Sequence, residues 1–157
     1  MVIELRKFFE GDDIRLDIDY EFNSEDELFS SPVKVKGYIK NSSGIVSLDV
    51  MSHVTITDDC AKCAKKVKNE MSVPSKHILV THLNDEDNDE FIVCEDMTLN
   101  LDELICEDIY LAMPMRVLCK EDCKGLCPYC GVDLNETTCS CKKPIDPRLS
   151  ALAQLLD

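Results

Sequence analysis

Eight of the ten cysteines in this 157-residue chain fall into four close pairs, and these pairs constrain the fold most. The pairs are Cys60-Ala-Lys-Cys63, Cys119-x3-Cys123, Cys127-Pro-Tyr-Cys130 and Cys139-Ser-Cys141. A structural zinc ion needs four ligands in a tetrahedron, and a CxxC turn separates two sulfur atoms by about 3.5–4 Å, the edge of that tetrahedron. Eight paired cysteines therefore predict two structural Zn2+ sites.

The distribution of the cysteines between the two sites is less constrained than their number. We assign Cys127, Cys130, Cys139 and Cys141 to one site, because a short hairpin joins these two pairs. The other site then takes Cys60 and Cys63, from a turn between two strands, together with Cys119 and Cys123. An exchange of Cys123 for Cys119, or of Cys123 for Cys139, between the sites is the alternative.

The segment Cys127-Pro-Tyr-Cys130-Gly131 is the best-formed half-site, because a glycine after the second cysteine lets the backbone turn its amides toward the sulfurs. CPYC is also a glutaredoxin-type active-site sequence, so a dithiol oxidoreductase is the alternative function. In that fold the first cysteine opens a helix that lowers its pKa. Here Val132-Asp-Leu-Asn135 follows instead, which favours zinc. The unpaired Cys94 and Cys106 are interpreted as small buried apolar side chains.

The predicted location also favours metal over disulfides. The chain contains no run of 18 apolar residues, so we expect no membrane-spanning helix. Its first residues, MVIELRKFFEGDD, lack the pattern of a secretory signal. We therefore expect a cytoplasmic protein in a reducing compartment, where paired cysteines bind metal more often than they form disulfides.

Charge is distributed unevenly over a chain whose net charge is -14. Residues 1–30 carry ten acids and three bases, and residues 84–108 carry eleven acids and no base. These stretches are interpreted as solvated faces and a loop, or as an acidic surface for a basic partner. Lysines cluster beside the cysteines, where they either offset thiolate charge or contact RNA. They are Lys62, Lys65, Lys66, Lys120, Lys124, Lys142 and Lys143.

Hydrophobic periodicity predicts an α+β fold. Alternation predicts strands over 14–22, 33–40 and 46–56, the last with a bend or bulge, and two more over 65–73 and 76–83. Asn41-Ser-Ser-Gly44 is typical of a hairpin turn, and short connections favour antiparallel pairing. Helices are expected from Leu101 to Ala112 and again after Asp146-Pro147, with an acidic loop from Asn84 to Glu90. We thus expect a mainly antiparallel sheet with one or two helices over 1–114. A cysteine-rich zinc-knuckle segment and C-terminal helix over 115–157 would pack on the same domain.

The sequence contains no motif that predicts catalysis. A P-loop, a dinucleotide-binding glycine pattern, HExxH and GxSxG are all missing. His53, His77 and His82 fall in predicted strands and are interpreted as ordinary strand residues. Thiolates would fill all four positions at each zinc ion, leaving none for a reactive water. We therefore predict a protein that is not an enzyme and has no small-molecule substrate.

The order of these segments resembles the YceD family of large ribosomal RNA subunit accumulation proteins. The resemblance is carried by CAKC at 60–63, Leu111-Ala-Met-Pro114, Cys119, GLCPYCGVDLN at 125–135 and DPRLSAL at 146–152, together with the Gly37 strand. In the family the first knuckle is typically Cys-x-Arg-Cys, and here Lys62 keeps the positive charge.

The resemblance implies a role in accumulation of large-subunit rRNA in bacteria and plastids. It is also what points to large-subunit rRNA or a basic ribosomal protein as the partner. Some family members lack the CPxCG and CxC cysteines, which implies that the second site stabilises the fold more than it acts directly.

Overall fold

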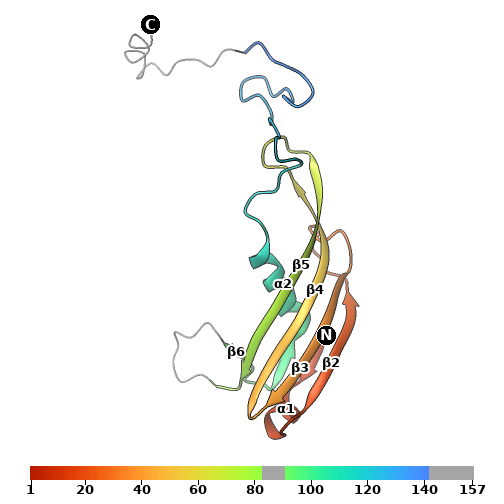
Figure 1. Cartoon of the computed structure of the whole chain (residues 1–157), viewed down its shortest axis with the longest axis vertical. Helices are drawn as coiled ribbons and strands as arrows, with labels where there is room; N and C mark the ends of the chain where they lie inside the picture. Colours follow the sequence, from red (N-terminus) through yellow and green to blue (C-terminus); the bar gives the residue numbers. More distant parts are fainter. Residues whose placement is uncertain (83–90, 142–157) are drawn as a thin grey trace, which may run out of the picture.

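The computed structural model describes residues 1–82 and 91–141, and its centre is a five-stranded sheet with the strand order β2-β3-β4-β5-β6 (Figure 1). The strands are β2 (Arg15–Phe22), β3 (Val33–Ser42), β4 (Ile45–Asp59), β5 (Lys66–Val80) and β6 (Phe91–Val93). The first four pair antiparallel in chain order, and β6 joins β5 in parallel. The structure confirms the predicted α+β class with a mainly antiparallel sheet.

The β3–β4 hairpin turns at Ser43 and Gly44, as the sequence predicts. Both residues have positive φ, 56° and 82°, which is the backbone of a type I′ turn. The strands that leave this turn stay in register from Ser42↔Ile45 to Lys34↔His53. Asn41, just before the turn, is buried, and its Nδ2 donates to the carbonyl oxygens of Phe8 at 2.6 Å and Gly11 at 2.7 Å.

The longest elements are β4 and β5, and here the structure differs from the sequence prediction in two respects. Their register is continuous from Val46↔Leu79 to Asp59↔Lys66, so β4 contains no bulge, while the bend that was the other alternative stays a prediction. The two strands expected at 65–73 and 76–83 form the single strand β5. Pro74 does not divide it, because β6 pairs only with residues 78–80 and β5 is an edge strand at Pro74, where a missing N–H is tolerated. His82 was predicted in a strand but follows the end of β5.

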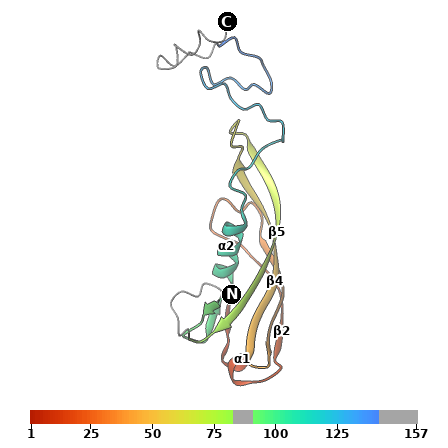
Figure 2. The same cartoon turned by 60° about the vertical axis from the view of Figure 1, so that its left-hand side comes forward.

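One face of the sheet is covered by helix α2 (Leu101–Ala112), by the short helix α1 (Arg6–Glu10) and by a small sheet of β1 (Val2–Glu4) with β7 (Thr98–Asn100) (Figure 2). Helix α2 has the predicted bounds and buries Leu104, Ile105 and Ile109. Strands β1, β6 and β7 and helix α1 are too short for periodicity to reveal and were not predicted.

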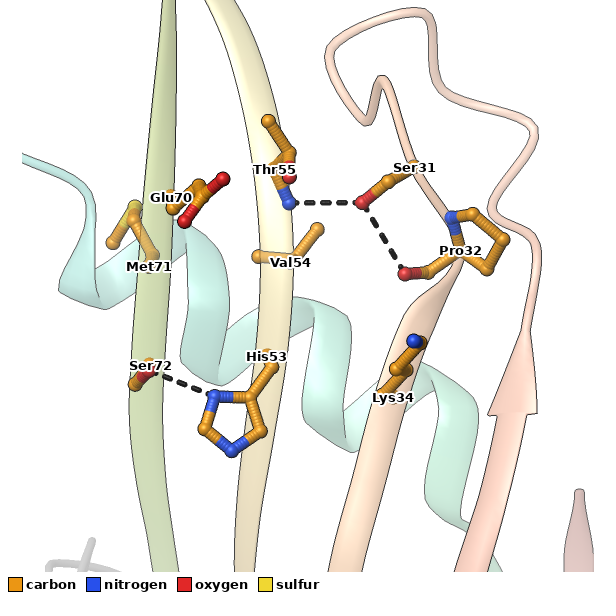
Figure 3. A pocket seen from close by; sticks show the side chains of 9 residues that line it. All are labelled: Ser31, Pro32, Lys34, His53, Val54, Thr55, Glu70, Met71 and Ser72. Carbon is orange, nitrogen blue, oxygen red and sulfur yellow. Dashed lines mark hydrogen bonds between the residues drawn. The ribbon is translucent and has the colours of Figure 1, made fainter.

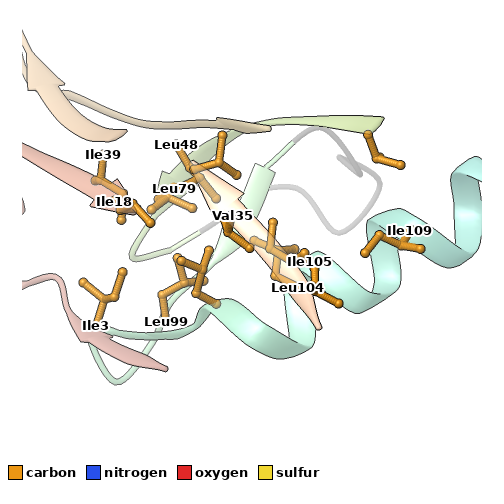
Figure 4. Close-up of a cluster of buried hydrophobic side chains, with 14 of the residues drawn as sticks. Ile3, Ile18, Val35, Ile39, Leu48, Leu79, Leu99, Leu104, Ile105 and Ile109 are labelled. Atoms are coloured by element: carbon orange, nitrogen blue, oxygen red, sulfur yellow. The ribbon is translucent and has the colours of Figure 1, made fainter. Parts of the chain in front are cut away.

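The hydrophobic core lies between this layer and the sheet (Figure 4). Val35, Ile39 and Leu48 contribute to this core from the strands and Ile105 contributes from α2, and all four are at most 1% exposed. Leu16 alternates with the buried Ile18 but is 40% exposed, because it lies near the start of the outer edge strand β2.

Beyond this core, β4 and β5 continue as a two-stranded ribbon to the cysteine-bearing segments (Figure 1). We call residues 57–68 and 116–141 the cysteine tip. The acidic loop expected from Asn84 and the helix expected after Asp146 lie outside the described residues. The division into residues 1–114 and 115–157 stays a prediction.

Candidate metal centres

The structure gathers the eight paired cysteines into two groups of four. The first cysteine group is Cys60, Cys63, Cys119 and Cys123, and the second cysteine group is Cys127, Cys130, Cys139 and Cys141. Within each group all sulfur atoms lie within 4.8 Å of one another. Of the alternatives left open by the sequence, the structure adopts the first assignment and neither exchange of Cys123.

The sulfur spacing fits a tetrahedral metal ion. At a Zn–S distance of about 2.3 Å the edge of the tetrahedron is about 3.8 Å. The Sγ atoms of Cys60 and Cys123 are 3.8 Å apart, and those of Cys63 and Cys119 are 3.5 Å apart. In the second group the Sγ atoms of Cys127 and Cys139 are separated by 3.4 Å. Four thiols at these distances form a donor set that soft, tetrahedral ions prefer.

The two CxxC turns share one backbone pattern. The N–H of Ala64 donates to the carbonyl of Cys60 at 2.9 Å, and the N–H of Gly131 donates to that of Cys127 at the same distance. Both residues after the second cysteine are left-handed, with φ of 55° at Ala64 and 72° at Gly131. The sequence predicted this conformation for Gly131 and missed it at Ala64, where the residue type gives no signal.

These turns also tune the acidity of their first cysteines. Hydrogen bonds from the backbone of Cys119 and Lys62 lower the pKa of Cys60 to about 6. Those from the backbone of Cys130 and Tyr129 lower the pKa of Cys127 to about 6. Because metals bind thiolates rather than thiols, the turns prepare one ligand of each group for binding at neutral pH.

The partner cysteines have the opposite shift. The hydrogen bond with Cys123, followed by burial, raises the pKa of Cys119 to about 12, and the hydrogen bond with Cys130, followed by burial, raises that of Cys141 to about 12. Like charges at short distance resist a second ionisation. Without a cation each group therefore holds protons, and a divalent ion would remove that repulsion.

The two groups differ sharply in burial. In the first group Cys60, Cys63 and Cys123 are at most 5% exposed, and Val67 and Leu118 pack against them. In the second group only Cys127 is buried, while Cys130 and Cys141 are exposed. The first group is thus a small second core, and the second is an open site.

The second group is attached to the first by contacts around Lys62 and Lys65. The N–H of Leu126 donates to the carbonyl of Lys62 at 3.0 Å. Lys65 Nζ lies 2.9 Å from an Asp133 carboxylate oxygen and 2.6 Å from one of Glu136. The ion pair with Lys65 is the main cause that lowers the pKa of Asp133 to about 2. These contacts hold the hairpin of the second group on the first CxxC turn.

Asn135 is a functional candidate that sequence reasoning missed. Its Nδ2 lies 3.4 Å from Cys123 Sγ, 12 residues away in the chain. Nothing in the local sequence identifies it, because the contact depends on how the hairpin folds back onto the first group.

Several of the predicted lysines beside the cysteines are engaged in ion pairs. Lys65 binds the acids named above, Lys66 Nζ lies 3.1 Å from Asp59, and Lys120 Nζ lies 3.9 Å from Asp122. Among residues 1–82 and 91–141, no acidic side chain lies within 4.0 Å of the amino group of Lys62 or Lys124. Lys142 and Lys143 lie outside the described residues.

The two unpaired cysteines and His77 have structural roles. Cys94 is 4% exposed, as predicted, whereas Cys106 was expected to be buried and is half-buried. Burial raises the pKa of both thiols, which keeps them protonated and unreactive. His77 Nε2 lies 2.8 Å from an Asp108 carboxylate oxygen, so this histidine joins β5 to α2.

A shallow pocket of about 350 Å³ lies at the start of β3, beside β4 and β5 (Figure 3). It contains His53, whose Nδ1 is 2.8 Å from Ser72 Oγ, and Ser31, whose Oγ accepts from the N–H of Thr55 at 3.0 Å. His53 and Ser72 are exposed residues that pair across neighbouring strands. Among the described residues, the cysteine groups are therefore the stronger candidate sites.

Within the part of the chain that the structure describes, no helix combines the length and apolar character needed to cross a bilayer.

Comparisons with known proteins agree with this geometry. The family model described as "Large ribosomal RNA subunit accumulation protein YceD" matches residues 48–156, a range that contains both cysteine groups and α2. The uncharacterized protein YlbN of Bacillus subtilis is 32% identical over 129 residues, covering 80% of this chain and 75% of the relative.

More distant relatives come from mycobacteria. An uncharacterized protein of Mycobacterium tuberculosis is 29% identical over 119 residues, which is 73% of this chain and 57% of the relative. One of Mycobacterium leprae is 26% identical over 121 residues, which is 71% of this chain and 55% of the relative. The chain thus spans little more than half the length of the mycobacterial proteins it matches. No solved structure matches the chain.

Proposed function

The chain belongs to the YceD family, and on that premise we propose that it is a non-catalytic, zinc-stabilised factor that assists large-subunit rRNA accumulation. The observation that carries the proposal is the family match over residues 48–156. It acts in ribosome biogenesis in the cytoplasm, by binding large-subunit rRNA or a basic ribosomal protein.

Zinc is the metal that best suits both cysteine groups. Four thiolates around one ion are typical of structural zinc sites, and they leave no coordination position open for a reactive water. The first cysteine group joins the turn between β4 and β5 to the segment after α2, and its residues Cys63 and Cys119 are 56 residues apart in the chain. Zinc therefore stabilises the fold, and residues on the surface of that fold bind the partner.

Two surfaces support the two kinds of partner. Lys62 and Lys124 are exposed beside the cysteine groups and suit phosphate contacts with rRNA. The exposed side of α2 carries Glu103 and Glu107 and suits a basic ribosomal protein. Binding through phosphates would weaken steeply as salt increases, and the double substitution Lys62→Glu and Lys124→Glu would abolish it. Binding of a ribosomal protein without RNA would instead be lost in Glu103→Lys with Glu107→Lys.

The cellular test is the ratio of large-subunit to small-subunit rRNA in cells that lack the gene. We expect this ratio to fall and to return when the wild-type gene is supplied. A ratio that stays the same after deletion, under growth conditions that demand ribosome synthesis, contradicts the proposed function.

A dithiol oxidoreductase is the second candidate, favoured by one observation. The pKa of Cys127 is lowered to about 6, as a reactive thiol requires. However, its side chain is 4% exposed, and Gly131 follows the motif in a left-handed conformation rather than opening a helix. Metal-free protein that reduces a disulfide substrate, with loss of this activity in Cys127→Ser, would replace the zinc proposal.

A further inference from the structure

Asn135 belongs to the hairpin of the second cysteine group, yet its side chain reaches the first. In the chain it lies between Cys130 and Cys139, and its Nδ2 is 3.4 Å from the Sγ of Cys123. Cys123 is 2% exposed, so the contact lies at a buried sulfur. One group therefore supplies a hydrogen-bond donor to a ligand of the other.

The orientation of the Asn135 amide is fixed by its other partners. Its Oδ1 accepts from the backbone N–H of Lys124 at 2.9 Å, and a backbone N–H can only donate. Its Nδ2 therefore faces Cys123 and also donates to Asp133 Oδ1 at 2.8 Å. Both Nδ2 hydrogen-bond donors thus have partners, and aspartate would replace both donors by an acceptor.

Asp133, which orients Asn135, is itself held by the first CxxC turn. Its carboxylate accepts from the backbone N–H of Asn135 at 2.8 Å and lies 2.9 Å from Lys65 Nζ. Lys65 comes two residues after Cys63. These contacts connect Lys65, after the first CxxC turn, to Asp133 and Asn135 of the second hairpin. Asn135 in turn contacts Cys123, which belongs to the first group.

We infer that Asn135 is a positioning residue through which the second cysteine group strengthens metal retention by the first. The inference rests on the metal-binding part of the proposed function. Four thiolates around a divalent ion carry a net charge of -2, and an N–H donor to one sulfur disperses that charge. Loss of such an outer-shell partner typically weakens metal binding by about 10–100-fold. The hairpin presents Asn135 correctly only while the second group is closed.

The first test compares Asn135→Asp and Asn135→Ala with the wild-type protein, using the whole chain loaded with zinc. A chromogenic chelator in excess reports the release rate of each ion, and the double variant Cys139→Ser with Cys141→Ser identifies the signal of the first group. We expect release from the first group to accelerate about 10–100-fold in both variants. Asn23→Ala, an exposed asparagine in the loop after β2, is the matched control and leaves both rates unchanged.

A spectroscopic measurement separates positioning from a general loosening of the tip. In protein loaded with cadmium-113, each group gives its own resonance, whose shift reports the electron density on its sulfurs. Asn135→Asp is expected to shift the resonance of the first group and leave that of the second in place. Unchanged release from the first group, or an unchanged cadmium resonance, overturns the inference.

The coupling between the groups is tested by combining variants. Cys139→Ser with Cys141→Ser is expected to accelerate release from the first group by the same factor as Asn135→Ala, and the combined variant is expected to release no faster. Factors that multiply would show that the two changes act independently and would overturn the inference. Wild-type protein that binds fewer than two zinc ions would refute the metal proposal instead, so the two failures are distinguishable.

Discussion

The two cysteine groups contain nearly the same CxxC turn, but they differ in burial and in the contacts that hold them. Each begins with a CxxC turn that closes through the same hydrogen bond and lowers the pKa of its first cysteine to about 6. The first group is buried at the end of a continuous ribbon, whereas the second is largely exposed and is held through Lys62 and Lys65 of the first. Sulfur geometry thus decides whether a metal ion fits, whereas the surrounding structure would decide how firmly a bound ion is held.

The largest expected effect comes from removing ligands of one group at a time. Cys60→Ser with Cys123→Ser should release both ions, because the second hairpin rests on the first turn. Cys139→Ser with Cys141→Ser should release only one. Metal content per chain, measured by elemental analysis on protein purified in reductant, checks both results. Equal losses in the two variants would show that the groups support each other symmetrically.

The next effect concerns the contact between the groups at Gly125. This residue has φ of 77°, and an added Cβ would lie 2.8 Å from the carbonyl oxygen of Lys62. Gly125→Ala should destabilise the tip by about 2–4 kcal/mol, combining left-handed strain with the clash. The measurement is the midpoint of zinc loss in a urea titration. An effect of Gly125→Ala no greater than that of Gly131→Ala, which has similar φ and open space, would contradict this prediction.

We expect acid to release metal from the two groups at different pH values, because the groups differ in exposure. Cys60 and Cys127 have a pKa of about 6 in the folded chain, below the ordinary 9.0, so the unfolded chain binds more protons between these values. The stability of the tip should therefore rise from pH 6 to pH 9 and be lost as pH falls through about 6. Zinc release measured during acidification should begin with the exposed second group. Release of the first group's ion before the second would contradict this order.

The smallest expected effects come from exchanging the residues that end the two turns. Ala64 holds φ of 55° with a side chain, so Ala64→Gly should stabilise the first turn by about 1 kcal/mol. Gly131→Ala imposes the same strain on the second turn and should destabilise it by a similar amount. Urea titrations of both variants check the pair. Changes of the same sign would mean that the two turns are not equivalent.

Much of this structure could be predicted from patterns that repeat over several residues. The alternation in β2, β3 and β4, the Ser43-Gly44 turn and the spacing of apolar residues in α2 are local signals, and the fold follows them. The grouping of the cysteines also followed from spacing, because a CxxC turn and a short hairpin leave few arrangements. Metal binding itself stays a prediction.

The features that sequence reasoning missed depend on distant contacts. The parallel pairing of β6 with β5 and the pairing of β1 with β7 involve three-residue strands that have no period of their own. The two strands expected over 65–73 and 76–83 are one strand, because Pro74 lies where β5 is an edge strand. Asn135 acquires its role only when the hairpin places it against Cys123, and the left-handed Ala64 carries a residue type that does not predict it.

The ribbon of β4 and β5 also sets a length scale. At about 3.4 Å per residue, 15 residues in each strand span roughly 50 Å, which exceeds the diameter of a compact domain of this size. The β3–β4 hairpin and the cysteine tip therefore lie at opposite ends of one continuous pair of strands, and α2 lies beside the middle of that pair (Figure 1). Partners bound at the two ends of these strands would be held at a spacing that the strands themselves set.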